Sequence, residues 1–291
     1  MLTLITATLN AGRYIEQAFA SVPHTPEAIQ HIVVDGGSND ATLQICRKFP
    51  WVDTVAAPGS SIYEAWNIGI ARARGNRIMF LNADDELAAG AVQAVAAGFG
   101  RNPAAEIVAG RALLFDRDAP AAEPRLLIAA PGGRLDLRQL SLGVPAINAM
   151  AFRRSVFERH GAFDTVYRIA GDRAFLLRLS LSSAAPAVAA TEAVLYRYFS
   201  HAGSLTLKAG LDQRLRIARD HISLANRLLA ERPPRDAARL LRHWRRREAA
   251  VATLRCAAAG KPLAACRYAR ELLGPAPPSG VGDQTKKARS A

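Results

Sequence analysis

The segment that decides the fold covers residues 61–87 and reads SIYEAWNIGIARARGNRIMFLNADDEL. Apolar residues at helical spacing predict a helix over residues 62–73. A short apolar run at residues 78–81 then predicts a buried strand, and the carboxylates of Asp84 and Asp85 follow it directly. A helix followed by a buried strand that ends in acidic residues is the repeating unit of an α/β protein with a ligand site at the strand ends.

The same alternation precedes this segment. Residues 2–8 and 32–34 are short apolar runs that predict buried strands, and residues 15–22 and 41–49 show helical spacing. Strands that alternate with helices predict a mostly parallel sheet with helices on both faces. Because ligands of such sheets bind outside the carboxyl ends of the strands, we expect Asp35, which ends the second strand, to lie near Asp84.

The rest of the chain is less regular. Residues 116–146 contain many Pro, Gly and Arg residues and predict an irregular surface or a mobile loop. Residues 152–181 read as helical with a break at 161–164, and the chain after residue 211 reads as entirely helical. The end, from Pro275, is rich in Pro, Gly and Lys and is expected to be disordered.

Composition excludes several classes of protein. The chain has 291 residues, of which 50% are hydrophobic and 22% charged, so it can bury a core without disulfides. The three cysteines (Cys46, Cys256 and Cys266) form no CxxC pair, which argues against a zinc module or a disulfide scaffold. Neither a signal peptide nor an apolar run long enough for a transmembrane helix is visible, which predicts a cytoplasmic protein.

The net charge of +13 is unevenly distributed. Residues 1–210 hold 20 Lys and Arg against 18 Asp and Glu, whereas residues 211–274 hold 15 against 6. This change in composition predicts a globular domain over 1–210, a helical Arg-rich extension over 211–274 and a disordered tail over 275–291.

Three segments resemble family 2 glycosyltransferases, which are inverting enzymes with a GT-A fold. They read ITATLNAGRYIEQAFASV with HIVVDGGSNDAT, then SIYEAWNIGIARARGNRIMFLNADDEL, then FRRSVFERHGAFDTVYRIAGDRAFLLRL, and they occur in the family's order over residues 2–180. The sequences of these segments most resemble those of bacterial enzymes that build exopolysaccharide, O-antigen or colanic-acid-type glycans. The resemblance implies a GT-A-like fold and the transfer of a sugar from a nucleotide diphosphate donor.

The acidic residues after the third strand are the expected metal site. A diphosphate leaving group needs a divalent cation, and carboxylates supply the hard oxygen ligands that Mg²⁺ or Mn²⁺ prefers. Asp84 is the first choice as ligand, with Asp85 beside it; the alternative is a turn or a helix cap. Asn82 stands where the family usually has an Asp, so it can bind a ribose hydroxyl but brings no charge to the metal. The six histidines show no metal-ligand spacing.

The resemblance also implies the donor-binding residues. Asp35 is expected to contact the base or ribose, unless it only stabilises an Asx-turn, and Ala7 and Thr8 are expected to line the same nucleotide pocket. Asn67 lies on the helix that faces the donor diphosphate in the family; the alternative is an exposed polar face.

The catalytic base is expected at Asp172. Inverting transfer needs a carboxylate that takes the proton of the acceptor hydroxyl as that oxygen attacks the sugar. The resemblance places this carboxylate at Asp172, where Gly171 replaces the family's Glu. An Asp at this position could instead cap the helix that follows.

Three interpretations of the basic extension remain open. Its helices pack on the catalytic domain, or lie on an anionic membrane surface where a lipid-linked acceptor is found, or bind an acidic partner or nucleic acid. In the second case the protein would be peripheral on the cytoplasmic face of the inner membrane. The rival to an enzyme is a non-catalytic binding or scaffold protein with a decayed donor site, recruited through these helices.

Overall fold

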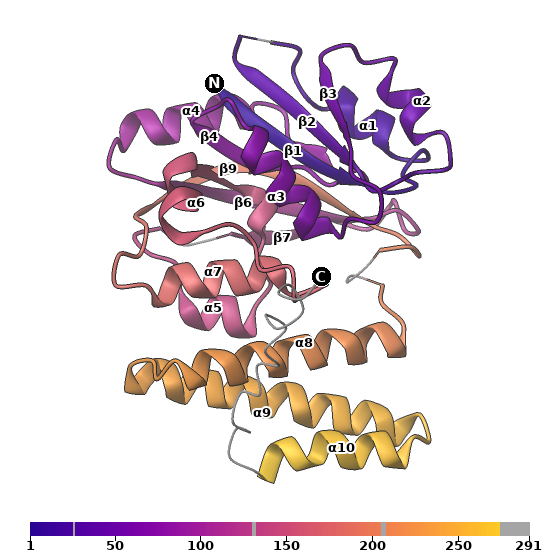
Figure 1. The fold of residues 1–291 in the computed structure, drawn as a ribbon, viewed down its shortest axis with the longest axis vertical. Helices are drawn as coiled ribbons and strands as arrows, with labels where there is room; N and C mark the ends of the chain where they lie inside the picture. The colour runs from indigo at the N-terminus through magenta and orange to yellow at the C-terminus, as the bar shows by residue number, and fades with distance from the viewer. Residues whose placement is uncertain (26, 130–131, 205–207, 274–291) are drawn as a thin grey trace, which may run out of the picture. The chain divides into compact units, whose positions relative to one another are not determined.

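The computed structural model describes residues 1–25, 27–129, 132–204 and 208–273 (Figure 1). It divides the chain into two compact units, Met1–Gly210 and Leu211–Ala291. The predicted disordered tail at 275–291 lies outside the described residues.

The first half of unit Met1–Gly210 contains the predicted alternation of strands and helices, together with a further strand at Val52–Ala56 that was not predicted, because its residues are exposed or half-buried. Its strands pair in parallel in the order β3-β2-β1-β4. Neighbouring strands β1 and β2 place Thr8 opposite Asp35, at their carboxyl ends. The elements are β1 (Leu2–Thr8), α1 (Ile15–Ala20), β2 (Ile29–Asp35), α2 (Thr42–Cys46), β3 (Val52–Ala56), α3 (Ile62–Arg72) and β4 (Arg77–Phe80).

Helices cover both faces of these strands, as predicted. Ile15 and Phe19 of α1 pack with Val33 of β2 on one face, while Ala65 of α3 packs with other β2 side chains on the opposite face. Helix α3 lies close to β1, because a Cβ at Gly69 would stand 2.4 Å from Ile5 Cγ2. Close packing of this kind holds α3 in a fixed position above the strand ends.

The second half of the sheet mixes directions. Strands β8 and β6 continue the sheet from β4 by antiparallel pairing, and β9 then runs parallel to β6. The strands are β5 (Glu86–Leu87), β6 (Ile107–Asp116), β7 (Arg125–Ile128), β8 (Met150–Arg153) and β9 (Val188–Ser200). The helices are α4 (Ala91–Arg101), α5 (Leu137–Leu142), α6 (Arg154–His160) and α7 (Gly171–Leu181). The fold is a mixed α/β sheet flanked by helices.

One prediction about this half is wrong. Residues 116–146 are not simply irregular, because β7 pairs with β6 and α5 begins at an Asp136 side chain that accepts the Gln139 N–H. The side chains of β7 are largely exposed, so the strand leaves no alternating apolar pattern in the sequence.

The described residues of unit Leu211–Ala291 are helical, as predicted, with α8 (Leu211–Ala230), α9 (Arg235–Ala258) and α10 (Pro262–Leu273). The unit has its own core, in which Ile222 packs with Ala252 and Cys256. The Tyr268 hydroxyl closes this core by donating to the Leu215 carbonyl (3.1 Å). Cys46 is buried like Cys256, whereas Cys266 is exposed. None of the helices in the described ranges is both long and apolar enough to cross a bilayer.

Candidate active site

The carboxyl ends of β1 and β2 form the first part of the site. Asp35 is 2% exposed, and its carboxylate accepts the N–H groups of Gly37 (3.0 Å) and Ser38 (2.9 Å). These bonds are the Asx-turn that the sequence left open as an alternative, and they fix the loop after β2. The Thr8 hydroxyl beside it is buried and has no hydrogen-bond partner among the described residues. An unpaired buried hydroxyl at a strand end is suited to bind a polar ligand.

The acidic loop after β4 is anchored through Asp85. Its carboxylate is 4% exposed and accepts hydrogen bonds from the Tyr196 hydroxyl (2.9 Å), the Asn82 amide (2.9 Å) and the Phe199 N–H (2.8 Å). Burial, and then the charge of Asp84, raise the pKa of Asp85. Because both Asp85 oxygens already accept protein donors, its predicted role as a metal ligand would require it to exchange one of these bonds.

Asn82 belongs to the same buried network. Besides its bond to Asp85, its side-chain oxygen accepts a long hydrogen bond from the Asn148 amide (3.4 Å). Asn148 also accepts the Tyr198 hydroxyl (3.1 Å). The amide of Asn82 therefore bridges Asp85 and Asn148 in this structure, which is a different use from the predicted contact with a ribose hydroxyl.

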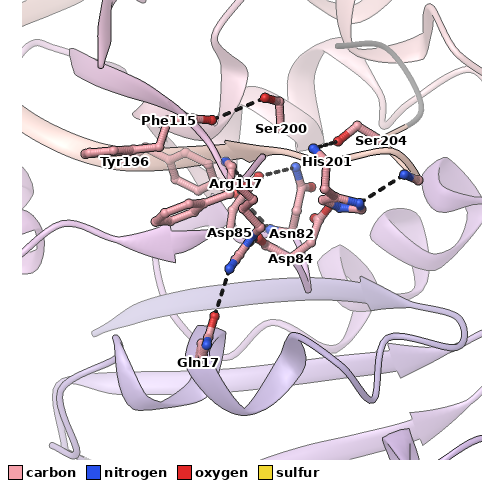
Figure 2. A network of polar contacts seen from close by, with 12 residues as sticks. Gln17, Asn82, Asp84, Asp85, Phe115, Arg117, Tyr196, Ser200, His201 and Ser204 are labelled. Carbon is pink, nitrogen blue, oxygen red and sulfur yellow. Dashed lines mark hydrogen bonds and ion pairs between the residues drawn. The ribbon is translucent and has the colours of Figure 1, made fainter. Parts of the chain in front are cut away.

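Asp84 faces the more open side of the loop. Its Oδ2 lies 2.9 Å from His201 Nε2, and its side chain is 34% exposed against 12% for that of His201 (Figure 2). The Arg117 guanidinium donates to the Asp84 carbonyl (3.0 Å) and to Gln17 Oε1 (3.1 Å), which ties the loop to α1. No sequence pattern singles out His201, because it lies 117 residues from its partner.

These two side chains fit a hard divalent cation. A carboxylate and an imidazole stand at hydrogen-bond distance with part of each exposed, and Mg²⁺ or Mn²⁺ commonly takes few protein ligands beside the phosphates of its substrate. Within the part of the chain that the structure describes, no three His, Cys, Asp or Glu side chains gather into a metal site. A cation here would be held by Asp84 and His201, with the remaining ligands from elsewhere.

Asp172 lies in the first turn of α7. The Tyr63 hydroxyl of α3 donates to the Ile169 carbonyl (2.7 Å) and shares this hydrogen bond with Asp172 Oδ1 at 3.2 Å. Burial, and then the charge of Asp172, raise the pKa of Tyr63 well above its usual value, so this hydroxyl stays protonated. Gly171 is required here, because a Cβ would stand 2.6 Å from the Tyr63 ring. Sequence analysis did not find this role of Tyr63.

Asp172 is electrostatically close to the acidic loop. Burial, followed by the charges of Asp85 and Asp172, raises the pKa of Tyr198 well above its usual value. The Tyr198 hydroxyl therefore interacts electrostatically with both the acidic loop after β4 and the carboxylate of α7, as expected for two parts of one site.

Asn67 performs a structural task. Its amide donates to the Phe163 carbonyl (2.9 Å), and its oxygen accepts the Phe163 N–H (2.9 Å). Both polar ends of the side chain thus hold the loop that leads to Asp172. The predicted contact of Asn67 with the donor would need a change in these bonds.

A sequence profile of Glycosyl transferase family 2 matches residues 3–161, more than half of the chain. The chain belongs to this family. It is therefore a glycosyltransferase, and the residues described above from β1 to β8 lie within the matched region.

Curated proteins that are similar in sequence are also named as glycosyltransferases. A PGL/p-HBAD biosynthesis glycosyltransferase of Mycobacterium tuberculosis (strain ATCC 25177 / H37Ra) is 28% identical over 193 residues, which are 61% of this chain and 69% of that protein. An uncharacterized glycosyltransferase of Mycobacterium tuberculosis (strain CDC 1551 / Oshkosh) is 32% identical over 160 residues, 53% of this chain and 58% of its own length.

Solved structures show the same fold at low sequence identity. S. aureus TarS 1-349 in complex with UDP-GlcNAc has a TM-score of 0.60 at 15% identity, covering 92% of this chain and 90% of that one. The mannosyltransferase PcManGT from Pyrobaculum calidifontis, in complex with GDP-Man and Mn²⁺, has a TM-score of 0.57 at 18% identity, covering 92% and 78%. This chain spans 43% of a longer TarS structure.

Proposed function

We propose that this family 2 glycosyltransferase moves a sugar, with inversion, from a nucleotide diphosphate sugar to a hydroxyl of a glycan or lipid-linked acceptor in bacterial polysaccharide biosynthesis. The observation that carries the proposal is the contact between Asp84 and His201 at the end of β4. It lies on the same sheet edge as the unpaired Thr8 hydroxyl. The complexes of TarS with UDP-GlcNAc and of PcManGT with GDP-Man and Mn²⁺ support such a donor.

In this proposal the nucleoside lies at the ends of β1 and β2, against Ala7 and Thr8 and beside the Asp35 turn. A divalent cation, Mg²⁺ or Mn²⁺, held by Asp84 and His201 would supply positive charge to the departing diphosphate. Asp85 and Asn82 hold the loop that presents Asp84.

Asp172 acts on the acceptor. Its carboxylate takes the proton of the attacking hydroxyl as that oxygen forms the bond to the sugar, on the side opposite the leaving diphosphate. The Tyr63 hydroxyl, 3.2 Å from Oδ1 of this carboxylate, helps to position it.

Calorimetric titration with UDP, GDP and dTDP, each with and without Mn²⁺, tests the donor site. We expect one nucleotide to bind, and to bind more tightly with Mn²⁺. The Asp84→Asn variant should lose the effect of Mn²⁺, because it removes the charge that holds the cation, whereas Asp212→Asn on the exposed surface of α8 should behave like the unchanged protein. Failure of all three nucleotides to bind folded protein would favour the non-catalytic alternative.

We propose in addition that α9 binds an anionic membrane surface, which would bring the enzyme to a lipid-linked acceptor. Arg235, Arg239, Arg242 and Arg246 recur every three or four residues along one side of α9, and all four are exposed. None of them forms an ion pair with a described residue. Four unpaired guanidinium groups on one stripe favour an anionic surface over a protein core as their neighbour.

Co-sedimentation with phosphatidylglycerol-containing vesicles tests this second proposal. Binding should weaken as salt is raised, and it should weaken further when the four arginines are changed to Gln. Equal binding of neutral vesicles, or of the four-fold variant, would contradict the proposal.

A further inference from the structure

A cavity that the proposed reaction does not use lies beside the Asp84–His201 pair. It measures about 520 Å³, within the range of small-ligand sites, and its wall includes Arg13, Tyr14 and Gln17 from the start of α1. The far wall comes from the ends of β6 and β9. The Tyr14 ring lies 4.6 Å from the His201 ring, so the cavity and the proposed metal site are neighbours.

The cavity wall has an excess of positive charge. The hydrogen bonds of Arg117 go to neutral acceptors, the Gln17 amide oxygen and the Asp84 carbonyl. Neither Arg117 nor the exposed Arg13 forms an ion pair with any described carboxylate. The one acidic lining residue, Asp116, is already paired with Lys208 (2.6 Å).

The shape of this wall suits a planar anion. The Arg117 guanidinium carbon lies 4.8 Å from the Tyr14 ring centre and 4.3 Å from that of Phe199, and these contacts hold its orientation. A guanidinium has five N–H donors, and the bonds to Gln17 and Asp84 engage only part of them. Because a fixed guanidinium binds carboxylate or phosphate through two parallel hydrogen bonds, Arg117 is ready to take such a group.

The lining also has groups that suit a sugar. The Gln17 oxygen accepts from Arg117, which leaves the amide nitrogen of Gln17 with two donors for hydroxyl groups. Aromatic rings supply apolar surface beside these polar groups, as in many small-molecule sites.

We propose that this cavity binds a negatively charged sugar unit of the acceptor glycan, one that carries a phosphate or a carboxylate. Arg13 and Arg117 bind the anionic group, and Gln17 binds hydroxyl groups of the ring. The inference rests on the proposed function, because the acceptor glycan supplies the sugar. It extends the proposed function by specifying that the acceptor is negatively charged, which the donor site does not determine.

The test is calorimetric titration of the full chain with glucose 6-phosphate, glucuronic acid, glucose and inorganic phosphate. The titrations are made in EDTA and with a saturating amount of the nucleotide found above, so that the donor site does not take up the probe. A charged sugar should bind at least about tenfold more tightly than glucose and than inorganic phosphate, because a charged hydrogen bond adds about 1.5–3 kcal/mol. The tighter of the two charged sugars identifies the anion.

Two variants locate the binding. Arg13→Gln should lower the affinity for the charged sugar by about tenfold or more. Arg101→Gln, which removes the same charge from the end of α4, should leave this affinity unchanged. Arg117→Lys keeps the charge but loses the planar fork, so it should weaken binding of the charged sugar.

Several results would overturn the inference. Glucose that binds as tightly as the charged sugars would show that charge is not recognised, and inorganic phosphate that binds equally would show an ion site alone. An unchanged affinity in Arg13→Gln would place the sugar elsewhere. If the unchanged protein binds the nucleotide but neither charged sugar, this inference alone is contradicted, whereas a failure to bind any nucleotide contradicts the proposed function.

Discussion

The carboxylate of Asp172 has one oxygen held by a tyrosine hydroxyl, and this arrangement leads to a direct test of the proposed base. Asp172→Asn keeps the shape of the side chain but removes its ability to take a proton. We expect sugar transfer to fall by about 10²–10⁴-fold, the usual contribution of a general base. Calorimetric titration with the donor nucleotide should show unchanged affinity.

A nearby carboxylate supplies the control for this variant. Asp164 lies in the loop before α7, where its Oδ1 accepts the Val166 N–H (3.0 Å), so Asp164→Asn removes a similar charge from the same region. This variant should retain most of the transfer rate. An equal loss in both variants would mean that the charge of the region, and not a base at Asp172, determines the rate.

A buried histidine predicts how stability depends on pH. His31 is 2% exposed, its Nε2 lies 2.9 Å from Thr6 Oγ1, and the Phe19 ring meets its ring edge to face. Burial lowers the pKa of His31 to about 4, against a smaller opposing effect of the Asp53 charge. The unfolded chain therefore takes up the proton first as pH falls, so stability is full above pH 6.5 and is lost toward pH 4.

The size of this effect can be measured in urea. Between pH 7 and pH 5, His31 should lower the free energy of unfolding by about 2 kcal/mol. His31→Gln should remove that part of the pH dependence, whereas His24→Gln should not, because His24 is exposed. A pH dependence unchanged in His31→Gln would contradict the prediction.

At this scale, the sequence identified strand-end residues better than their partners. Thr8, Asp35 and Asp84 could be found because each stands at the end of a buried strand or in the loop that follows it. The proximity of His201 to Asp84 could not be found, since it depends on where β9 ends relative to β4. The contact of Tyr63 with Asp172 could not be predicted for a similar reason, because the two residues lie 109 positions apart in the sequence.

The start of α3 is stabilised by a capping box. The Ser61 hydroxyl accepts the Glu64 N–H (3.4 Å), and the Glu64 carboxylate accepts the Ser61 N–H (2.7 Å). Ser61→Ala removes one of these two hydrogen bonds, the one that the Ser61 hydroxyl accepts. It should lower the free energy of unfolding by about 0.5–2 kcal/mol, as measured by urea denaturation. Because α3 carries Tyr63, the transfer rate should fall as well.

The neighbouring serine is a matched control for this helix. The Ser60 hydroxyl is buried and has no hydrogen-bond partner among the described residues, so Ser60→Ala removes no bond. It should leave stability nearly unchanged. If Ser60→Ala lowered the free energy of unfolding as much as Ser61→Ala, then the lost stability would come from packing in the loop and not from the cap.

Strands β1, β2 and β4 could be predicted because they are buried almost throughout, whereas β3, whose residues are exposed or half-buried, could not. All seven residues of β2 are buried, so its apolar run stands out from the sequence around it. Strand β9 is harder to recognise, since exposed and half-buried residues such as Ala190 and Arg197 alternate irregularly within it. Its register with β6 also shifts near Arg111, which no sequence pattern indicates.

At the scale of the whole molecule, the described residues of each unit include a hydrophobic cluster of their own. Ile222 is 6% exposed within the core of α8, α9 and α10. Ile222→Ala should lower the stability of unit Leu211–Ala291 by about 2–5 kcal/mol. Hydrogen exchange followed by mass spectrometry should then show faster exchange in peptides from residues 211–273 and little change in those from β1 to β4.

Ser223→Ala, on the exposed side of the same helix, is the control and should leave exchange unchanged. Equal acceleration throughout both units in Ile222→Ala would show that the chain unfolds as one cooperative body. That result would contradict the view that each unit is held by its own core.

The exposure of Cys266 makes the natural chain convenient for spectroscopy. Two of the three thiols are shielded inside cores, so a maleimide dye should react with α10 selectively, without any engineered cysteine. A fluorophore at this one position would report on the arginine-rich unit while the transferase unit stays unlabelled. The native sequence thus provides a site for attaching a dye, so that binding of this unit to lipid vesicles can be followed in real time.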